Sequence, residues 1–230
     1  MRIIGFLAVL AALNGAQAGE LFRDDFSKLP PRLLSAPVKE LTNAIQEYHY
    51  LAHRGVDTRP WQKAICHDDA WLAGDEDGRP YLEQHTIHGM PELWNPMMMV
   101  GDEEWSDYTV EVKVRALSTA DFAGVVFRYR TNRHYYLFGL RDGNTAFLTL
   151  RLPYEKTYRQ AEWKELATAE FAYDSDTYYT LRVENDGARM VASIDGEPIL
   201  EATDDEVLKG TAGVTATIPA RFLEFVVTAS

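Results

Sequence analysis

The feature of this sequence that most constrains its fold is a nearly unbroken alternation of apolar and polar residues from Tyr108 onward. Alternation with period two is typical of β-strands that bury one face. Turn-forming residues separate the alternating segments and no helical period intervenes, so the sequence predicts an all-β fold, an antiparallel two-sheet β-sandwich. The predicted strands are Tyr108–Arg115, Ala123–Arg130, Tyr135–Arg141, Thr145–Leu152, Glu165–Phe171, Thr177–Glu184, Arg189–Asp195, Thr211–Ile218 and Arg221–Thr228.

The residues before Tyr108 alternate less regularly. Leu21–Phe26 and Pro80–His85 are predicted strands. Glu47–His53 is compatible with a strand or with part of a helix, and the strand is favoured. Thr86–Trp105 is rich in aromatic residues and methionine, which favours a long loop packed against the sandwich.

The N-terminus has the three parts of a secretory signal peptide. A positively charged start is followed by the apolar run Ile3–Leu13 and by small residues that end at Ala18. We expect cleavage after Ala18 and a secreted or periplasmic protein in which residues 19–230 form a single domain. The alternative, a membrane anchor, needs roughly 18 or more apolar residues, and Asn14 interrupts this run.

Charge and cysteine content narrow the possible partners. The formal net charge is −12 and the pI about 4.9, which argues against nucleic acid. No later stretch is apolar for long enough to span a membrane. Cys66 is the single cysteine, so no intrachain disulfide can form, and a buried thiol is its expected state.

The hairpin that spans Val125–Leu140 can be registered from its own pattern. A two-residue turn at Asn132–Arg133 gives one wholly apolar face, which is the core face. A three-residue loop, Asp142–Asn144, then places the next strand in the same register, whereas a two-residue loop would invert it. The predicted partners on the core face are Tyr129 with Tyr136, Phe127 with Phe138, Val125 with Leu140, Leu148 with Phe138 and Ala146 with Leu140.

The opposite face of these three strands is predicted to gather cations and aromatic rings on one outward surface. Arginine forms two-point contacts with carboxylates and aromatic rings stack on sugars, so this surface suits an acidic polysaccharide. The alternative is a solvated sheet face whose arginines pair with nearby acidic residues. The candidate carbohydrate-binding residues are Arg128, Arg130, Tyr135, Arg141, Phe147 and Arg151, to which Trp94 is added as a possible groove residue.

Three stretches of the chain resemble a known superfamily: Gly101–Val112, Ala123–Arg130 and His134–Tyr136. They are similar to the concanavalin A-like lectin/glucanase superfamily, and above all to laminin-G-like domains of bacterial polysaccharide-degrading proteins. The likeness covers nearly the whole chain after residue 18, with Phe22–Phe26 as the opening strand. It implies a jelly roll and a carbohydrate ligand, but its motifs are architectural.

Catalytic members of that superfamily offer two comparisons. Its glucanases carry a Glu-x-Asp-x-x-Glu or Glu-x-Asp-x-Glu cluster, which is absent here, so a glucanase is not predicted. The alternative is a polysaccharide lyase or another glycosidase on the same sheet face. In a lyase, arginine would neutralise a uronate and tyrosine or histidine would take the C5 proton. The candidate catalytic residues are Arg128, His134, Tyr135 and Arg141.

Two places in the sequence offer candidate metal ligands. Sandwiches of this superfamily often hold a structural calcium ion near the first strand, which makes Asp24 and Asp25 candidate ligands, although a solvated strand end is the favoured interpretation. His85 and His88 have a spacing that converges on a metal only across a turn.

The leading hypothesis is therefore a carbohydrate-binding jelly-roll module that recognises an acidic polysaccharide and requires no cofactor. The alternatives are an enzyme on the same face and a surface domain for structure or adhesion that binds protein.

Overall fold

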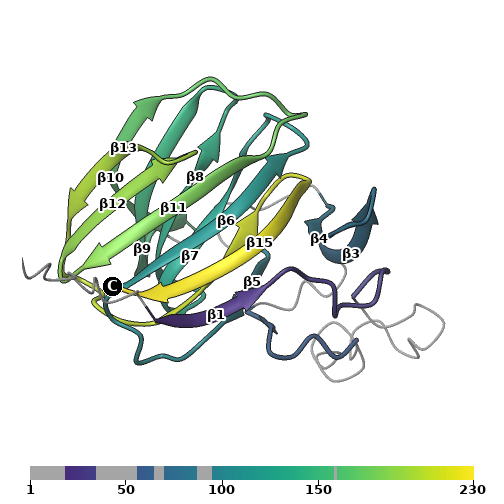
Figure 1. Cartoon of the computed structure of the whole chain (residues 1–230). Coiled ribbons are helices and arrows are strands. Elements are labelled where there is room, and N and C mark those ends of the chain that lie inside the picture. Colours follow the sequence, from purple (N-terminus) through teal and green to yellow (C-terminus); the bar gives the residue numbers. More distant parts are fainter. Residues whose placement is uncertain (1–18, 35–55, 65–69, 87–94, 158–159) are drawn as a thin grey trace, which may run out of the picture.

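A computed structural model describes residues 19–34, 56–64, 70–86, 95–157 and 160–230. Two antiparallel sheets pack face to face, which confirms the predicted β-sandwich (Figure 1). No helix in the described part of the chain is long and apolar enough to cross a membrane. The predicted signal peptide and Glu47–His53 lie outside the described residues, as do Cys66, His88 and Trp94.

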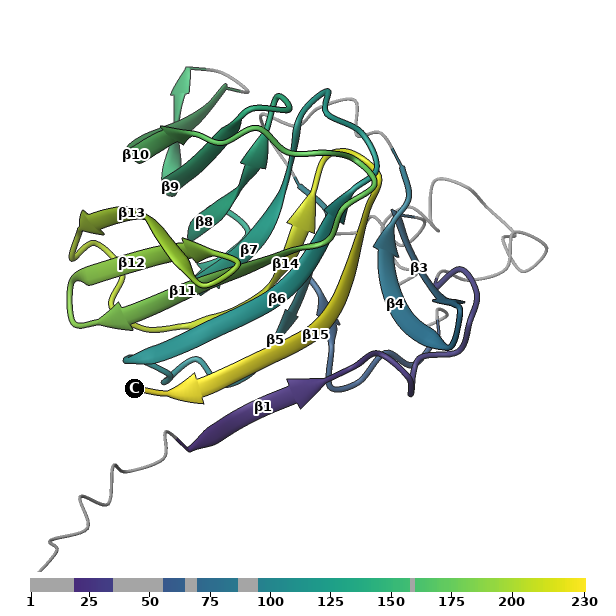
Figure 2. The ribbon, with the colours of Figure 1, turned by 45° about the horizontal axis from the view of Figure 1, so that its top comes forward.

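The first sheet has eight strands, and β1 pairs with β15 at its side (Figure 2). In spatial order its strands are β13 (Glu197–Thr203), β12 (Arg189–Ile194), β11 (Tyr179–Asp186), β6 (Tyr108–Ala116), β15 (Ala220–Ala229), β4 (Arg79–Gln84) and β3 (Trp71–Glu76), with β1 (Glu20–Asp24) beside β15.

The second sheet has seven strands. In spatial order they are β10 (Gln160–Glu170), β9 (Thr145–Thr157), β8 (His134–Arg141), β7 (Phe122–Thr131), β14 (Thr211–Ala216), β5 (Met97–Val100) and β2 (Gln62–Lys63). The strand β5 lies within Thr86–Trp105, so the prediction of one long loop is wrong there.

The core between the sheets follows from the alternation. On β6, Val110, Val112 and Val114 are buried, whereas Glu111 and Lys113 point away from the core. Burying a valine side chain contributes about 1.5 kcal/mol or more, and the inward rows of all the long strands repeat the pattern.

The β7–β8 hairpin confirms the predicted two-residue turn, because Thr131 pairs with His134 across Asn132–Arg133. A register shift between Phe127 and Thr131 then displaces the rest of β7 along β8 by two residues. The predicted partners in this hairpin are therefore wrong. The observed ones are Phe127 with Tyr136, Val125 with Phe138 and Ala123 with Leu140.

Arg128 lies at this register shift and has a left-handed backbone, with φ of 48°. The bulge reverses the side-chain alternation, because Arg128 becomes fully buried and Tyr129 packs against the residues of the outer face. The predictions that Arg128 faces outward and Tyr129 faces the core are both wrong.

The β8–β9 hairpin follows the predicted three-residue loop. Leu148 pairs with Phe138 and Ala146 pairs with Leu140. Phe147, Thr149 and Arg151 consequently lie on the face that points away from the core.

Candidate functional site

The outer face of the seven-stranded sheet carries a second apolar cluster. Its buried members are Met97, Met99, Phe122, Val126, Tyr135, Leu137 and Phe147, and Tyr129 and Trp163 pack against them. An antiparallel sheet that faced water here would alternate apolar and polar residues across its two faces. This face therefore offers an apolar surface that can form the wall of a binding site.

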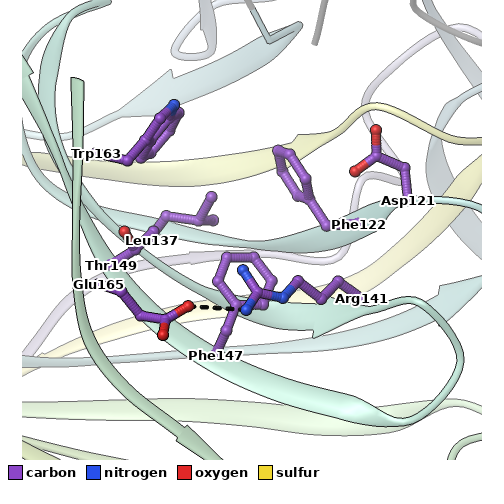
Figure 3. Close-up of a pocket in the computed structure, with 8 residues that line it drawn as sticks. All are labelled: Asp121, Phe122, Leu137, Arg141, Phe147, Thr149, Trp163 and Glu165. Carbon is purple, nitrogen blue, oxygen red and sulfur yellow. Dashed lines mark hydrogen bonds and ion pairs between the residues drawn. The ribbon is translucent and has the colours of Figure 1, made fainter. Parts of the chain in front are cut away.

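A cleft of about 420 Å³ opens on this face, over β7, β8, β9 and β10 (Figure 3). Aromatic rings and charged groups both point into it (Figure 3). Its volume falls within the range typical of small-molecule sites. The lining residues are Asp121, Phe122, Leu137, Arg141, Phe147, Thr149, Trp163 and Glu165.

Cross-strand pairing explains why these residues meet. Thr149 on β9 pairs with Leu137 on one side and with Glu165 on the other. Phe122 on β7 pairs with Arg141 on β8. Directly paired residues share a face of the sheet, so residues distant in sequence line one wall.

Gly139 on β8 makes room for the aromatic part of the cleft. It lies opposite Phe147 on β9 and Gly124 on β7, and a side chain there would start 2.6 Å from the carbonyl oxygen of Ala123. Since no side chain stands between them, Phe122 and Phe147 come into edge-to-face contact, with ring centroids 5.7 Å apart.

Arg141 is held in the cleft by two contacts. Its guanidinium carbon lies 4.8 Å from the centre of the Phe147 ring, and its Nη2 donates to Glu165 Oε2 at 2.8 Å. The Asp142 carboxylate lies 4.0 Å from Arg141 Nε. The guanidinium is therefore both oriented and neutralised (Figure 3).

Asp121 lies on the opposite side of the cleft from Glu165 (Figure 3). Burial raises the pKa of its carboxyl, and although a hydrogen bond with Thr217 works in the other direction, the net pKa stays above its ordinary value. Asp121 is thus a partly desolvated hydrogen-bond acceptor at the rim of an aromatic site.

No protein family matches this sequence, and no curated protein matches it. Solved structures match its fold. A structure described as carbohydrate-binding module CBM66 from Bacillus subtilis is 14% identical with a TM-score of 0.56, and the match covers 74% of this chain and 95% of that one. A protein of unknown function with a galectin-like fold, also from Bacillus subtilis, is 14% identical with a TM-score of 0.54, covering 92% and 96%.

A third similar structure is a mutant of the GH43 protein BlXynB from Bacillus licheniformis, which is 16% identical with a TM-score of 0.54. The match covers 74% of this chain but 37% of that protein, so this chain corresponds to a part of it. At these low identities, the structural matches show a shared sandwich fold alone. The narrower likeness to laminin-G-like domains stays a prediction.

Two of the predicted binding residues, Arg141 and Phe147, line the cleft, as placed by the predicted register of β8 and β9. The other arginines do not form a cationic surface with them. Arg128 is fully buried and donates to the carbonyl oxygens of Gly187 at 2.5 Å and Val207 at 3.4 Å. Its predicted role on an outward surface is wrong.

Tyr135 and Arg151 lie on the predicted face but are about 1% exposed. The Tyr135 hydroxyl accepts a hydrogen bond from Asn95 Nδ2 at 3.1 Å. Arg151 Nη1 donates to the carbonyl oxygens of Leu152, Tyr154 and Glu162. Both side chains are part of the packed sheet face. The prediction that they are presented to solvent is therefore wrong.

Arg130 is exposed, and its guanidinium donates to the carbonyl oxygen of Glu103 at 3.1 Å and lies 3.7 Å from the carboxylate of the same residue. His134 Nε2 lies 3.5 Å from Glu206 Oε1. His134 and Arg141 stand at opposite ends of β8, about 23 Å apart at 3.3 Å per residue. The structure therefore does not bring the predicted lyase residues together.

The cleft also contains residues that the sequence interpretation missed: Asp121, Trp163 and Glu165. Trp163 and Glu165 are two residues apart on β10 and pair with Arg151 and Thr149. The pairing of β9 with β10 shifts register between Ala161 and Trp163 and again between Glu165 and Ala167, so a period-two pattern extended by one more strand would not have placed these residues on this face.

Asp24 and Asp25, the candidate calcium ligands, have acceptor roles within the protein. Asp24 Oδ1 accepts from the Phe26 amide at 2.8 Å and Oδ2 from Trp61 Nε1 at 2.7 Å. Asp25 Oδ1 accepts from the amide and hydroxyl of Ser27. Within the described ranges, no group of three or more His, Cys, Asp or Glu side chains is placed to hold a metal ion.

Proposed function

We propose that this chain binds a saccharide in the cleft on the outer face of the seven-stranded sheet. The observation that carries the proposal is the combination of ring faces and polar groups in one concave site. Phe122, Phe147 and Trp163 supply apolar walls, while Asp121 and Glu165 supply acceptors. A sugar ring has an apolar C–H face and a rim of hydroxyl donors, so it complements both.

The similar structures support this proposal, because one of them is described as a carbohydrate-binding module with nearly its whole length matched. The site differs from the Arg/Tyr surface expected from the sequence. Arg141 and Phe147 belong to both the predicted and the observed site. The buried arginines Arg128 and Arg151 do not line the observed site, which contains Trp163 and the carboxylates of Asp121 and Glu165 instead.

A panel of oligosaccharides screened by calorimetry tests the proposal. We expect Trp163→Ala to weaken binding at least tenfold, about 1.4 kcal/mol, because it removes one wall of the cleft. Tyr154→Ala is the matched control, since this ring is 58% exposed and does not line the cleft. Equal affinities for wild type and a folded Trp163→Ala protein would place the site elsewhere.

Glycosidase activity is a second candidate, favoured by the two carboxylates that face the cleft from opposite sides. Glycosidases use two such groups as acid and as base or nucleophile, and a carboxyl with a raised pKa is the usual acid. Release of reducing ends by the wild type, lost in Asp121→Asn with binding retained, would establish this activity. Binding without product would favour the module.

Residues 1–18 are proposed to be a signal peptide that directs the protein out of the cytoplasm. N-terminal sequencing of the exported protein should read from Gly19, and a chain that retains Met1 would contradict the proposal.

A further inference from the structure

We propose that the cleft selects uncharged sugar residues and rejects uronates. This inference rests on the proposed function and names the class of ligand for the same site. It reverses the expectation of an acidic polysaccharide. The reason is that the positive charge in the cleft is already paired with a carboxylate of the protein, whereas negative charge is left over.

The cation in the cleft is already paired. Among the described residues that line it, Arg141 alone carries a positive charge. Its Nη2 is bound to Glu165 at 2.8 Å and its guanidinium lies over Phe147. A uronate that bound this guanidinium would have to come close to the carboxylates of Glu165 and Asp142, which lie 2.8 Å and 4.0 Å from its nitrogens.

The remaining charge of the cleft is negative. Asp121 and Glu165 outnumber Arg141, and the Asp142 carboxylate lies just outside, 4.0 Å from Arg141 Nε. Like charges brought together at a partly desolvated site repel strongly. The net charge of −12 for the whole chain adds a repulsion that acts at longer range.

Arginines elsewhere on this sheet do not supply the missing cation. The guanidinium of Arg128 is buried among backbone carbonyls, and that of Arg151 donates to three of them. Arg130 lies beside the Glu103 carboxylate. These three arginines, which were predicted to attract an anionic ligand, are thus paired within the protein.

The same carboxylates suit a neutral sugar. An ionised carboxylate has only acceptor sites, and the hydroxyls of a neutral sugar are donors. Asp121 and Glu165 approach from opposite sides, so hydroxyls at two edges of one ring can be bound while its C–H face lies against Trp163.

Matched sugars that differ only at C6 test the inference. The probes are methyl glycosides of glucose and glucuronate, galactose and galacturonate, and mannose and mannuronate, titrated by NMR at low and high salt. We expect the neutral member of the pair that binds to be at least tenfold tighter. The difference should narrow in high salt, because salt screens the repulsion.

Two variants assign the effect to the cleft. Asp121→Asn removes one of the negative charges and should narrow the ratio between the neutral and the acidic sugar at least threefold. Glu224→Gln removes the same charge on the other sheet, where Glu224 pairs with Lys113, and should leave the ratio unchanged.

The outcomes separate the inference from the proposed function. Uronates that bind more tightly than their neutral partners, with loss of binding in Trp163→Ala, would overturn the inference and keep the cleft as the site. Equal affinities for the two members of a pair would overturn it as well. Absence of any sugar binding that depends on Trp163 would overturn both.

Discussion

Replacing Tyr136 with phenylalanine removes one hydroxyl group that joins the two sheets. Tyr136 on β8 is fully buried and donates to Asp204 Oδ1 at 2.5 Å, just beyond the end of β13. The same hydroxyl accepts from the Val207 amide at 3.3 Å. Because the ring is kept, its stacking on Phe127, at 5.5 Å between centroids, is unchanged.

The expected loss follows from the charge of the acceptor. A hydrogen bond to an ionised group contributes about 1.5–3 kcal/mol, and Val207 also loses its acceptor, so the free energy of unfolding should fall by about 2–3 kcal/mol at pH 7. With a urea m-value of about 2–3 kcal/mol/M, the unfolding midpoint should fall by about 1 M.

The loss should also depend on pH. Burial raises the pKa of Asp204, but hydrogen bonds from Lys164 and Tyr136 outweigh it and hold the pKa below its ordinary value of 3.8. A depressed pKa stabilises the fold above 3.8, and this contribution is lost as pH falls through the lowered pKa. Tyr136→Phe removes one of the hydrogen bonds that lower the Asp204 pKa. The difference in unfolding free energy between wild type and this variant should therefore be largest at pH 7 and should shrink below about pH 3.8.

Urea unfolding at pH 7 and pH 3 measures both effects. Tyr178→Phe is the control, because the structure shows no hydrogen bond between that hydroxyl and another described residue, and it should change stability by less than about 0.5 kcal/mol. A loss below about 0.5 kcal/mol in Tyr136→Phe at pH 7, or a loss of equal size at both pH values, would refute the reasoning.

Three further outcomes are expected. Gly213→Ala places Cβ 2.1 Å from the Met98 carbonyl oxygen and should lower the unfolding free energy by about 1–3 kcal/mol in urea titrations, whereas Gly19→Ala, with open space around it, should be neutral. Arg128→Ala should lower the thermal midpoint but leave sugar affinity unchanged at temperatures where it is folded, and a loss of affinity without a loss of stability would contradict its burial. Because the pKa of Asp121 is raised, this carboxyl stabilises the fold when it is protonated, and that contribution is lost as pH rises through the raised pKa. Asparagine stays neutral at every pH, so urea unfolding at pH 7 should find Asp121→Asn no less stable than wild type.

The sequence predicted the fold class because most strands bury only one face. On such strands the alternation identifies the inward residues, as Val110, Val112 and Val114 show on β6. The same rule, with the three-residue loop, placed Phe147 correctly across from Gly139. Local pattern was sufficient where one face met the core and no bulge shifted the register that the turn had set.

Strand β5 escaped prediction because it has no alternation. Its four residues, Met97–Val100, are all buried, with some facing the core and others the outer apolar cluster. A run buried on both faces carries no period-two signal. For the same reason the sequence did not reveal that the outer face is apolar.

The bulge at Arg128 also left no local signal. The run Phe127-Arg128-Tyr129-Arg130 alternates perfectly, and nothing in it favours a left-handed arginine. What accommodates that conformation comes from far along the chain, since the carbonyl acceptors of the guanidinium belong to Gly187 and Val207. Contacts across the sandwich decide the local backbone here.

The reversal of the ligand prediction has the same origin. The arginines predicted on one outward sheet face suggested an anionic ligand, but residue types alone say nothing about which charges are already paired. On this sheet Arg128 and Arg151 are bound to carbonyl oxygens, and Arg141 is bound to Glu165. An anion bound to Arg141 would come close to Glu165 within a site that is already negative, whereas a neutral sugar uses the carboxylates as they stand.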